Sequence, residues 1–392
     1  MRDVFVYKNG KIYKDGTGKP LKSSKILGCH NNYKLAISKN CDVFLKESIG
    51  ASDYADVICK KLCDEVGIEC AENDLVIMKD FPSFDDKEML SFEEYVEFCK
   101  SNAHISDMEK IKAFYNNYLE NYEKSKIKHA LISYDYTKES PYDDAKIIVL
   151  SDLVHTYCKV TGEEGTFAID TYNKIVNEFV DPNSEIGKQM RKHLKIKKKL
   201  VLSPDFDLNL KKIALFGYAT CQIDMSCYNL HIALIKDKNG YNVDVAPLFD
   251  NGESFNLSSF YDEYSMDNAK DVVESSEEYS NALTLTESSG LYINRQLDDL
   301  VDELLCNPGL RDFYEKLKRV DIESVCKKAS IHEPEYEFIQ YSVMSIFEKR
   351  MAILEQAYKK KLDSNNKTKK SIYRTDFVKN ENIEKDNYEI KK

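Results

Sequence analysis

The sequence lacks any apolar segment long enough to cross a membrane. Its longest apolar runs, such as Ile147–Leu150 and Ala214–Phe216, are far shorter than the ~20 residues that a membrane span requires. The first eight residues, from Met1 to Lys8, also lack the apolar core of a signal peptide. We therefore expect a cytoplasmic protein that has no contact with a membrane.

The sequence also lacks the spacing of a disulfide or zinc framework. Its 11 cysteines are odd in number and spread over 392 residues, and none forms a Cys-x-x-Cys pair. Cys59 and Cys63 lie four residues apart in a stretch of helical pattern, which does not match the spacing of zinc ligands. The 7 histidines are dispersed and form no His-x-x-x-His pair. We expect reduced thiols that pack as small hydrophobic side chains.

Two common classes of enzyme find no support in the sequence. It has neither the Gly-x-Ser-x-Gly turn of many hydrolases nor the glycine signature of dinucleotide-binding enzymes. Its formal net charge of −11 argues against general affinity for nucleic acids. Hydrolase, dehydrogenase and general nucleic-acid-binding functions are therefore disfavoured.

The composition does fit a folded protein of more than one unit. Hydrophobic residues make up 42% of the chain and charged residues 31%, which is enough apolar material for packed cores. At about 150 residues per domain, 392 residues predict two or three units.

The amino-terminal part has the pattern of short strands around one helix. The helix is expected to begin at a cap formed by Ser52 and Asp53 and to end at Gly67. Residues 90–125 show helical periodicity and are predicted to be an insertion. The expected strands are Val4–Tyr7, Lys11–Tyr13, Tyr33–Ser38, Asp42–Lys46 and Leu75–Met78.

Helices dominate the pattern beyond residue 146, with one clear exception. Leu230–Ile235 and Tyr241–Ala246 are joined by a turn that contains Asn239 and Gly240, the strongest short-range signal for a β-hairpin. Residues 363–392 are rich in Lys, Asn and Glu and poor in apolar residues, so we expect a disordered tail. The predicted units are 1–146, 147–362 and this tail.

Polar residues flank the predicted hairpin on both sides. Asp224 and Asn229 come just before its first strand, and Asp250 follows its second strand. A hairpin brings its two ends together, so these three side chains are expected to converge. Phosphoryl transfer needs such a group, in which one carboxylate accepts the proton of the attacking hydroxyl while an amide and a second carboxylate hold Mg²⁺. Asp224 fits the first role, and Asn229 and Asp250 fit the second.

The same segments resemble motifs of the HipA-like kinase family. Pro-Leu-Phe-Asp-Asn-Gly at 247–252 is similar to the family's metal-binding segment, and Asp224 and Asn229 are spaced as in its catalytic loop. The resemblance covers roughly residues 21–355, with strong matches in four places. It implies an α+β, bilobal protein-kinase-like fold with a β-rich amino-terminal lobe (1–146) and a mainly helical carboxy-terminal lobe (147–362). It also implies Ser/Thr protein kinase activity that uses ATP and Mg²⁺.

Further residues take their expected roles from this resemblance. Val43-Phe-Leu-Lys46 resembles the family strand that ends in a phosphate-contacting lysine. Asp56 stands where the family's next helix normally carries a Glu that pairs with this lysine. Met225 and Ser226 stand where the family has Arg-His, residues that support the catalytic loop and do not act as its base.

The expected phosphate loop is the weakest part of the resemblance. It spans residues 23–34 and contains one glycine, Gly28, so a cofactor-binding loop and a simple turn between strands both stay open. Because some family members phosphorylate a serine here, Ser23 and Ser24 are candidate autophosphorylation sites.

The partners follow from the same resemblance and from charge. We expect an unidentified protein substrate, and the toxin-type members of the family leave an antitoxin partner open. Seven acidic side chains in residues 259–280 would suit a basic substrate or form a solvated loop. Direct nucleic-acid binding is disfavoured even at the basic run 188–199, which has no aromatic side chain other than His193. The alternatives are a pseudokinase that acts as a nucleotide-binding interaction module and a kinase acting on a lipid or small molecule.

Overall fold

The chain has a mixed α+β architecture, with a β-sheet in its amino-terminal part and mostly helices in its carboxy-terminal part. At this level the predicted fold class is confirmed. The structure is a computed structural model. It describes residues 4–8, 11–25, 33–38, 41–47, 51–79, 92–93, 95–97, 108, 110–116, 127–138, 140–163, 169–224, 229–260, 264–279, 297–329, 331 and 333–389.

The first sheet has seven strands in the order β2-β1-β6-β7-β5-β4-β3. Val43 and Leu45 of β5 are fully buried in the core of this sheet, and the period of two places Lys46 on the opposite face. β5 is an interior strand between β4 and β7, so the backbone beneath Lys46 is held from both sides. The strands are β1 (Val4–Lys8), β2 (Lys11–Lys14), β3 (Lys22–Lys25), β4 (Tyr33–Ser38), β5 (Cys41–Glu47), β6 (Asn73–Lys79) and β7 (Ile127–Tyr134).

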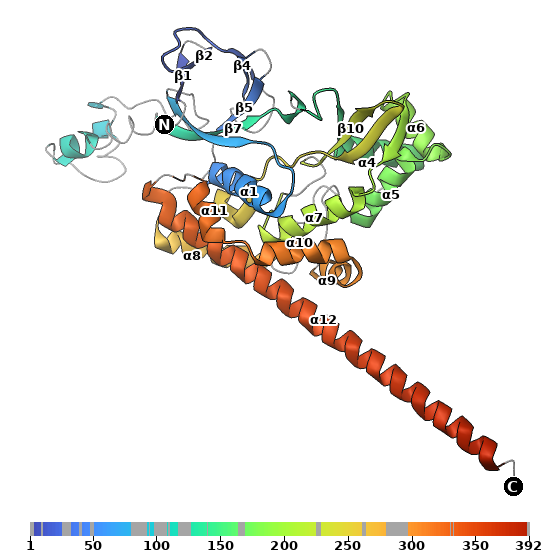
Figure 1. The fold of residues 1–392 in the computed structure, drawn as a ribbon. Helices are drawn as coiled ribbons and strands as arrows, with labels where there is room; N and C mark the ends of the chain where they lie inside the picture. Colours follow the sequence, from blue (N-terminus) through green and yellow to red (C-terminus); the bar gives the residue numbers. More distant parts are fainter. Residues whose placement is uncertain are drawn as a thin grey trace.

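Helix α1 (Ser52–Val66) lies beneath this sheet and beside the carboxy-terminal helices (Figure 1). Gly67 ends it with φ 78° and donates its N–H to the Cys63 carbonyl at 2.8 Å, as predicted. The predicted cap of Ser52 and Asp53 is wrong, because the N-cap residue is Ala51, which has no capping side chain. A tertiary bond holds this end instead, since the N–H of Ala51 donates to the Leu257 carbonyl at 3.2 Å.

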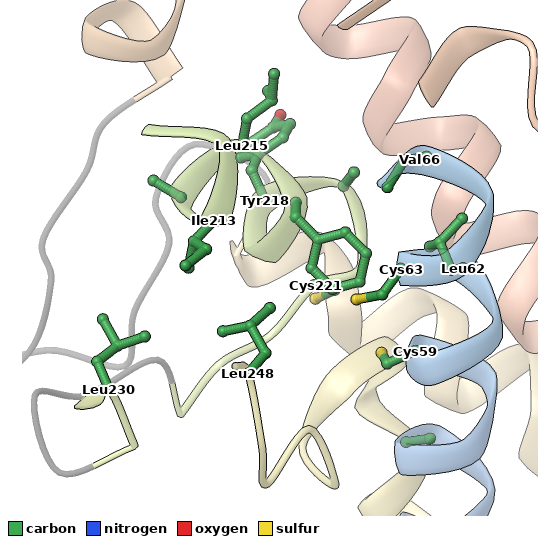
Figure 2. Close-up of a cluster of buried hydrophobic side chains, with 14 of the residues drawn as sticks. Cys59, Leu62, Cys63, Val66, Ile213, Leu215, Tyr218, Cys221, Leu230 and Leu248 are labelled. Atoms are coloured by element: carbon green, nitrogen blue, oxygen red, sulfur yellow. The ribbon is translucent and has the colours of Figure 1, made fainter. Parts of the chain in front are cut away.

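The core between α1 and α7 (Phe206–Ala219) joins the two parts of the chain. Figure 2 shows Cys63 of α1 next to Cys221, which follows α7, in a cluster that also contains Cys59, Leu62 and Val66 of α1. No disulfide joins the cysteines that the structure describes, and their reduced state stays a prediction. This packing brings α1 close to the loop that follows α7.

The second sheet carries the predicted hairpin. β10 (His231–Asp237) and β11 (Gly240–Val245) pair antiparallel around the turn at Lys238 and Asn239, as the sequence predicts. β8 (Lys146–Val149) pairs with β10, and β9 (Lys199–Leu202) pairs with β11. The hairpin therefore stands in the middle of a four-stranded sheet, and its two open ends have fixed positions.

Helices surround this second sheet and fill the rest of the carboxy-terminal part (Figure 1). The first sheet ends at Tyr134 and the second begins at Lys146, while the predicted lobe boundary at residue 146 stays a prediction. The helices are α4 (Leu150–Thr161), α5 (Ile169–Val180), α6 (Glu185–His193), α8 (Met266–Ser275), α9 (Leu297–Cys306), α10 (Pro308–Lys318), α11 (Ile322–Lys328) and α12 (Glu333–Glu389), with short 3₁₀ turns η1 (Tyr136–Lys138), η2 (Ser254–Ser259) and η3 (Ser276–Tyr279).

Helix α12 extends well beyond the rest of the molecule (Figure 1). It continues to Glu389, where the sequence predicted a disordered tail from residue 363. Each residue added to an existing helix gains a backbone hydrogen bond without a new nucleation step. Lys and Glu are also good helix formers, so low apolar content did not exclude a helix here.

The predicted insertion at 90–125 is helical wherever the structure describes it, at residues 92–93, 95–97, 108 and 110–116. In the part of the chain that is described, no helix has both the length and the apolar character needed to cross a membrane.

Replacing Gly240 by Ala tests the close contact between β9 and β11. A Cβ at this position would lie 2.2 Å from the carbonyl oxygen of Lys199, so the two backbones must separate. We expect the free energy of unfolding, measured by urea denaturation, to fall by about 2 kcal/mol. Lys238→Ala, in the exposed turn of the same hairpin, is the control and should change it by less than about 0.5 kcal/mol. A Gly240→Ala protein as stable as the parent would contradict this packing.

Candidate functional site

Asp250 lies just beyond the hairpin and is fixed by its backbone and its side chain. Its φ of 55° is in the left-handed region, which Asp and Asn tolerate better than most side chains. The Asp250 carbonyl accepts a hydrogen bond from Gln222 Nε2 at 3.2 Å. Its Oδ1 lies 2.7 Å from Lys46 Nζ. Residues from three distant segments therefore meet at Asp250.

Asp224 and Asn229, which precede the first strand of the hairpin, are in direct contact. Asn229 Nδ2 lies 2.9 Å from the Asp224 carbonyl and 2.9 Å from its Oδ2. The intervening residues 225–228, which include Met225 and Ser226, lie outside the described part of the chain. Asp224 also feels the charge of Asp250. The structure therefore brings together the three residues that the hairpin pattern predicted to converge.

The environment of Asp224 favours its protonated form. Burial is the strongest influence and raises the pKa of this carboxyl group. The negative charges of Asp250 and Glu253 raise it further, and the hydrogen bond from Asn229 lowers it. The resulting pKa lies above the ordinary value, which brings it nearer to neutral pH, as suits a general base.

Lys46 lies between two carboxylates, and the nearer one was not expected. Its Nζ is 2.7 Å from Asp250 Oδ1 and 4.0 Å from Asp56 Oδ2. Burial lowers the pKa of Lys46, but the charges of Asp56 and Asp250 together outweigh it, so the pKa is raised. The ammonium group therefore stays protonated at neutral pH.

The carboxylate of Asp56 is bound to the backbone of the segment that carries Asp250. Its Oδ1 accepts the N–H of Asn251 at 2.6 Å, and only 4% of its side chain is exposed. Burial raises the pKa of Asp56 to about 6, against the opposing effect of the Lys46 charge. The expected ion pair with Lys46 is thus long, and the main contact of Asp56 is Asn251.

Sequence reasoning missed two residues of this site, Gln222 and Asn251. Gln222 accepts the N–H of Asp224 at 3.2 Å through Oε1 and donates to the Asp250 carbonyl through Nε2. It therefore ties the two ends of the hairpin together. Its position two residues before Asp224 was visible, but an uncharged amide gave no sign of this bridging role. Asn251 acts through its backbone N–H, which any residue except proline provides.

The proposed phosphate loop is only partly covered by the structure. Gly28 lies outside the described residues. Ser23 is exposed on β3 and lies opposite Leu35 of β4. Ser24 follows it on the same strand, whose backbone alone is described there. β3 is an edge strand, separated by β4 from the strand that carries Lys46.

His231 comes two residues after Asn229, and its side chain is packed against neighbouring residues. Its ring centroid lies 4.2 Å from that of Phe249, and its Nδ1 is 2.8 Å from the Tyr136 hydroxyl. Burial lowers the pKa of His231 to about 4, although the charge of Asp152 acts in the opposite direction. It is therefore neutral near pH 7 and supports the position of Phe249, next to Asp250.

The basic run at 188–199 has internal partners for some of its charges. Lys188 Nζ pairs with Glu185 at 2.6 Å, and Arg191 Nη1 donates to the Asp181 carbonyl at 2.9 Å. These contacts agree with a solvated helical face. That nucleic acids do not bind here stays a prediction.

The donor set at the hairpin ends fits Mg²⁺. Asn229 uses its amide nitrogen to contact Asp224, so its Oδ1 and the Asp250 carboxylate are the two oxygen ligands that the site could offer. Within the described residues, no three His, Cys, Asp or Glu side chains gather closely enough to hold a metal ion by themselves. Mg²⁺ is commonly held by one or two protein oxygens, with phosphate oxygens and water completing its shell.

Comparisons with known proteins give structural similarities but no match to a protein family or to a curated protein. The structure is similar to one titled "Crystal structure of A Helicobacter pylori proinflammatory kinase CtkA", with a TM-score of 0.49, 11% sequence identity, and coverage of 86% of this chain and 96% of that chain. A similarity this low carries no argument about activity. The HipA-like relationship predicted from the motifs therefore stays a prediction.

Asp56→Asn tests the electrostatic description of the site through its pH dependence. The folded state holds a proton on Asp56 up to about pH 6, while an unfolded Asp loses it near pH ~3.9. Ionisation therefore makes the parent less stable as the pH rises from about 4 to 6. An asparagine keeps the Oδ1 acceptor for Asn251 but does not ionise. In buffer with EDTA, the stability of the parent relative to Asp56→Asn should fall by ~2 kcal/mol over this range and then level off.

Urea denaturation at several pH values measures this difference. Asp271→Asn removes an exposed carboxylate on α8, and its stability relative to the parent should not vary in the same way. A constant difference between the parent and Asp56→Asn from pH 4 to 7 would contradict a raised pKa at Asp56.

Proposed function

We propose that the chain is an ATP- and Mg²⁺-dependent Ser/Thr protein kinase of the HipA-like type, which transfers the γ-phosphoryl group to a protein hydroxyl. The observation that carries this proposal is the convergence of Lys46, Asp224, Asn229 and Asp250 from separate segments of the chain. One cation, one carboxylate of raised pKa and two oxygen ligands are the groups that phosphoryl transfer requires.

Asp224 is the proposed catalytic base. Its Oδ2 is bound to Asn229, so this hydrogen bond sets the direction of the carboxylate and leaves Oδ1 for the hydroxyl of a substrate. The raised pKa of Asp224 makes it a better proton acceptor than an ordinary carboxylate. It would orient the hydroxyl and accept its proton as the phosphoryl group is transferred.

Asn229 and Asp250 are the proposed ligands of Mg²⁺. When bound, this ion supplies positive charge to the β- and γ-phosphate oxygens. Gln222 contributes by holding the backbone of Asp250 and the N–H of Asp224 at once, so that base and metal ligand keep a fixed separation.

Lys46 is the proposed contact for the α- and β-phosphates. It is protonated and reaches the site from an interior strand. Its ammonium group contacts Asp250 at 2.7 Å, and anionic phosphates would compete with this carboxylate for it. Asp56 Oδ2 lies 4.0 Å from Lys46 Nζ. Its charge would keep the ammonium group near the site whether Lys46 contacts Asp250 or a phosphate.

Transfer to the protein itself is proposed at Ser23 or Ser24. Ser23 is exposed, as a phosphate acceptor must be. Phosphate found on the peptide 21–34 after incubation with ATP would support autophosphorylation at these serines. An unmodified peptide would contradict it. An antitoxin partner and the identity of the protein substrate rest on the resemblance alone.

A pseudokinase is the second candidate, and the Lys46–Asp250 contact favours it. A lysine bound directly to the metal-binding carboxylate opposes entry of a second cation. In this case the chain would bind nucleotide and act as an interaction module. Nucleotide binding without transfer in the presence of Mg²⁺ or Mn²⁺ would identify it.

Asp224→Ala and Asp250→Ala test the proposed activity. Purified protein is incubated with labelled ATP and Mg²⁺, and transfer to itself and to a lysate is measured. Loss of the base should lower the transfer rate by about 10²–10⁴-fold while nucleotide affinity changes little. Loss of Asp250 should lower both the rate and the Mg²⁺-dependent nucleotide affinity.

Asp312→Ala, which removes an exposed carboxylate on α10, is the matched control and should keep full activity. The proposal would be wrong if Asp250→Ala transferred phosphate at the parent rate.

Gln222→Leu tests whether the bridge between the hairpin ends positions the base. Leucine has a similar volume but neither of the two hydrogen bonds. We expect kcat to fall by about 10-fold or more with little change in KM for ATP, because positioning acts on the transition state. Equal kcat values for Gln222→Leu and the parent would show that the bridge has no such role.

A further inference from the structure

A pocket of about 290 Å³ lies between helix α7, the second sheet and the segment that follows α1. Its charged lining, among the described residues, consists of Glu69, Lys212 and Asp244. Glu69 comes shortly after α1, Lys212 lies on α7 and Asp244 lies on β11. None of the proposed phosphoryl-transfer residues lines this pocket, so it is a separate site.

Contacts within the lining place both carboxylates at the pocket. Tyr142 lines it and donates its hydroxyl to Glu69 Oε2. Asp244 Oδ1 lies 3.4 Å from Asn209 Nδ2 and accepts the N–H of Val245 at 2.7 Å, and both of these partners line the pocket too. Burial, the hydrogen bond to Glu69 and the charges of Glu69 and Asp244 raise the pKa of Tyr142. The Tyr142 hydroxyl is therefore within electrostatic reach of both carboxylates.

Helix α7 presents Lys212 to the same pocket. Lys212 comes three residues after Asn209 and Ile213 comes four residues after it, so the three side chains share one face of the helix. All three line the pocket. A long side chain on a helix leans towards the helix N-terminus, which directs the ammonium group of Lys212 over Asn209 and towards Asp244.

The charges that line the pocket do not neutralise one another. Among the residues that the structure describes, none of the three has an ion-pair partner, whereas the neighbouring Lys211 is paired with Asp207 and Glu303 at 2.9 and 3.0 Å. Two carboxylates and one ammonium group thus give the lining a net charge of −1. Between them the walls are aliphatic, with Ile213 of α7 and Ile235 of β10. Such a lining is complementary to a ligand with two cationic groups, one anionic group and an aliphatic chain.

We propose that this pocket binds a free basic α-amino acid, with L-arginine as the best match. Lys212 pairs with the α-carboxylate of the ligand, and the α-ammonium and guanidinium groups pair with Asp244 and Glu69. A guanidinium group contacts a carboxylate through two parallel hydrogen bonds. The aliphatic chain of the ligand covers Ile213 and Ile235. The volume of the pocket is at the lower end of the range of small-molecule sites, which suits a ligand of this size.

Isothermal titration of the full chain with L-arginine tests this proposal without any nucleotide. The first control ligand is L-citrulline, which has the same shape but a neutral ureido group. The second is agmatine, which lacks the carboxylate. L-Arginine should bind at least about 10-fold more tightly than either control. Equal affinity for L-arginine and either control, or no saturable binding of L-arginine up to about 10 mM, would overturn the proposal.

Two variants locate the binding at this pocket. Both positions are only partly buried, so neither substitution empties a packed core. Lys212→Met should weaken L-arginine at least about 10-fold without weakening agmatine, because agmatine has no carboxylate for the lysine to bind. Asp244→Asn keeps the Oδ1 acceptor for Val245 but removes the charge, and should weaken both ligands at least about 10-fold.

Lys238→Met, in the exposed turn of the hairpin that carries Asp244, is the matched control. It should bind L-arginine within about twofold of the parent. Unchanged affinity for L-arginine in Lys212→Met or in Asp244→Asn would place the ligand elsewhere and overturn the assignment.

Discussion

The buried carboxylate of Asp56 connects the parts of the chain on which the site depends. One of its oxygens accepts the N–H of Asn251 at 2.6 Å, and the other lies 4.0 Å from Lys46. Helix α1, which carries it, packs on the first sheet and on α7. The sheet that bears Lys46 and the segment that bears Asp250 are therefore positioned by the same helix, and any change in the packing of α1 moves both.

The raised pKa values of Asp56 and Asp224 have a shared origin. The carboxyl group of Asp56 is buried and that of Asp224 is partly buried, and both feel the charge of Asp250. Three carboxylates at the centre face one ammonium group, Lys46, so negative charge is in excess, and Glu253 adds to it. Excess negative charge attracts cations and raises the pKa of the carboxyl groups in the site. The raised pKa of Asp224 and the proposed affinity for a divalent cation both have their physical basis in this charge distribution.

Local patterns predicted much of this arrangement, and tertiary contacts account for the rest. The Asn239–Gly240 turn fixed the hairpin, and the hairpin in turn predicted that Asp224 and Asp250 converge, because two antiparallel strands must bring their ends together. The bridging role of Gln222 was not predicted, because its two hydrogen bonds form only when the segments before and after the hairpin have come together. The start of α1 was wrong because a backbone bond from Ala51 to a residue some 200 positions away replaced the local cap. Pairings of such long sequence separation leave no periodic signal in the sequence.

The length of the Asp56 side chain explains why Lys46 contacts Asp250. A glutamate, the residue that the resemblance to HipA-like kinases predicts at this position, is one methylene longer and would reach further from α1 towards the lysine. The shorter aspartate is held by the N–H of Asn251, which leaves Lys46 Nζ at 4.0 Å from it and 2.7 Å from Asp250. Coulomb attraction falls with distance, so the ammonium group interacts more strongly with the Asp250 carboxylate than with the Asp56 carboxylate of the helix. The short side chain of Asp56, held by Asn251, thus leaves Asp250 as the nearer partner of Lys46.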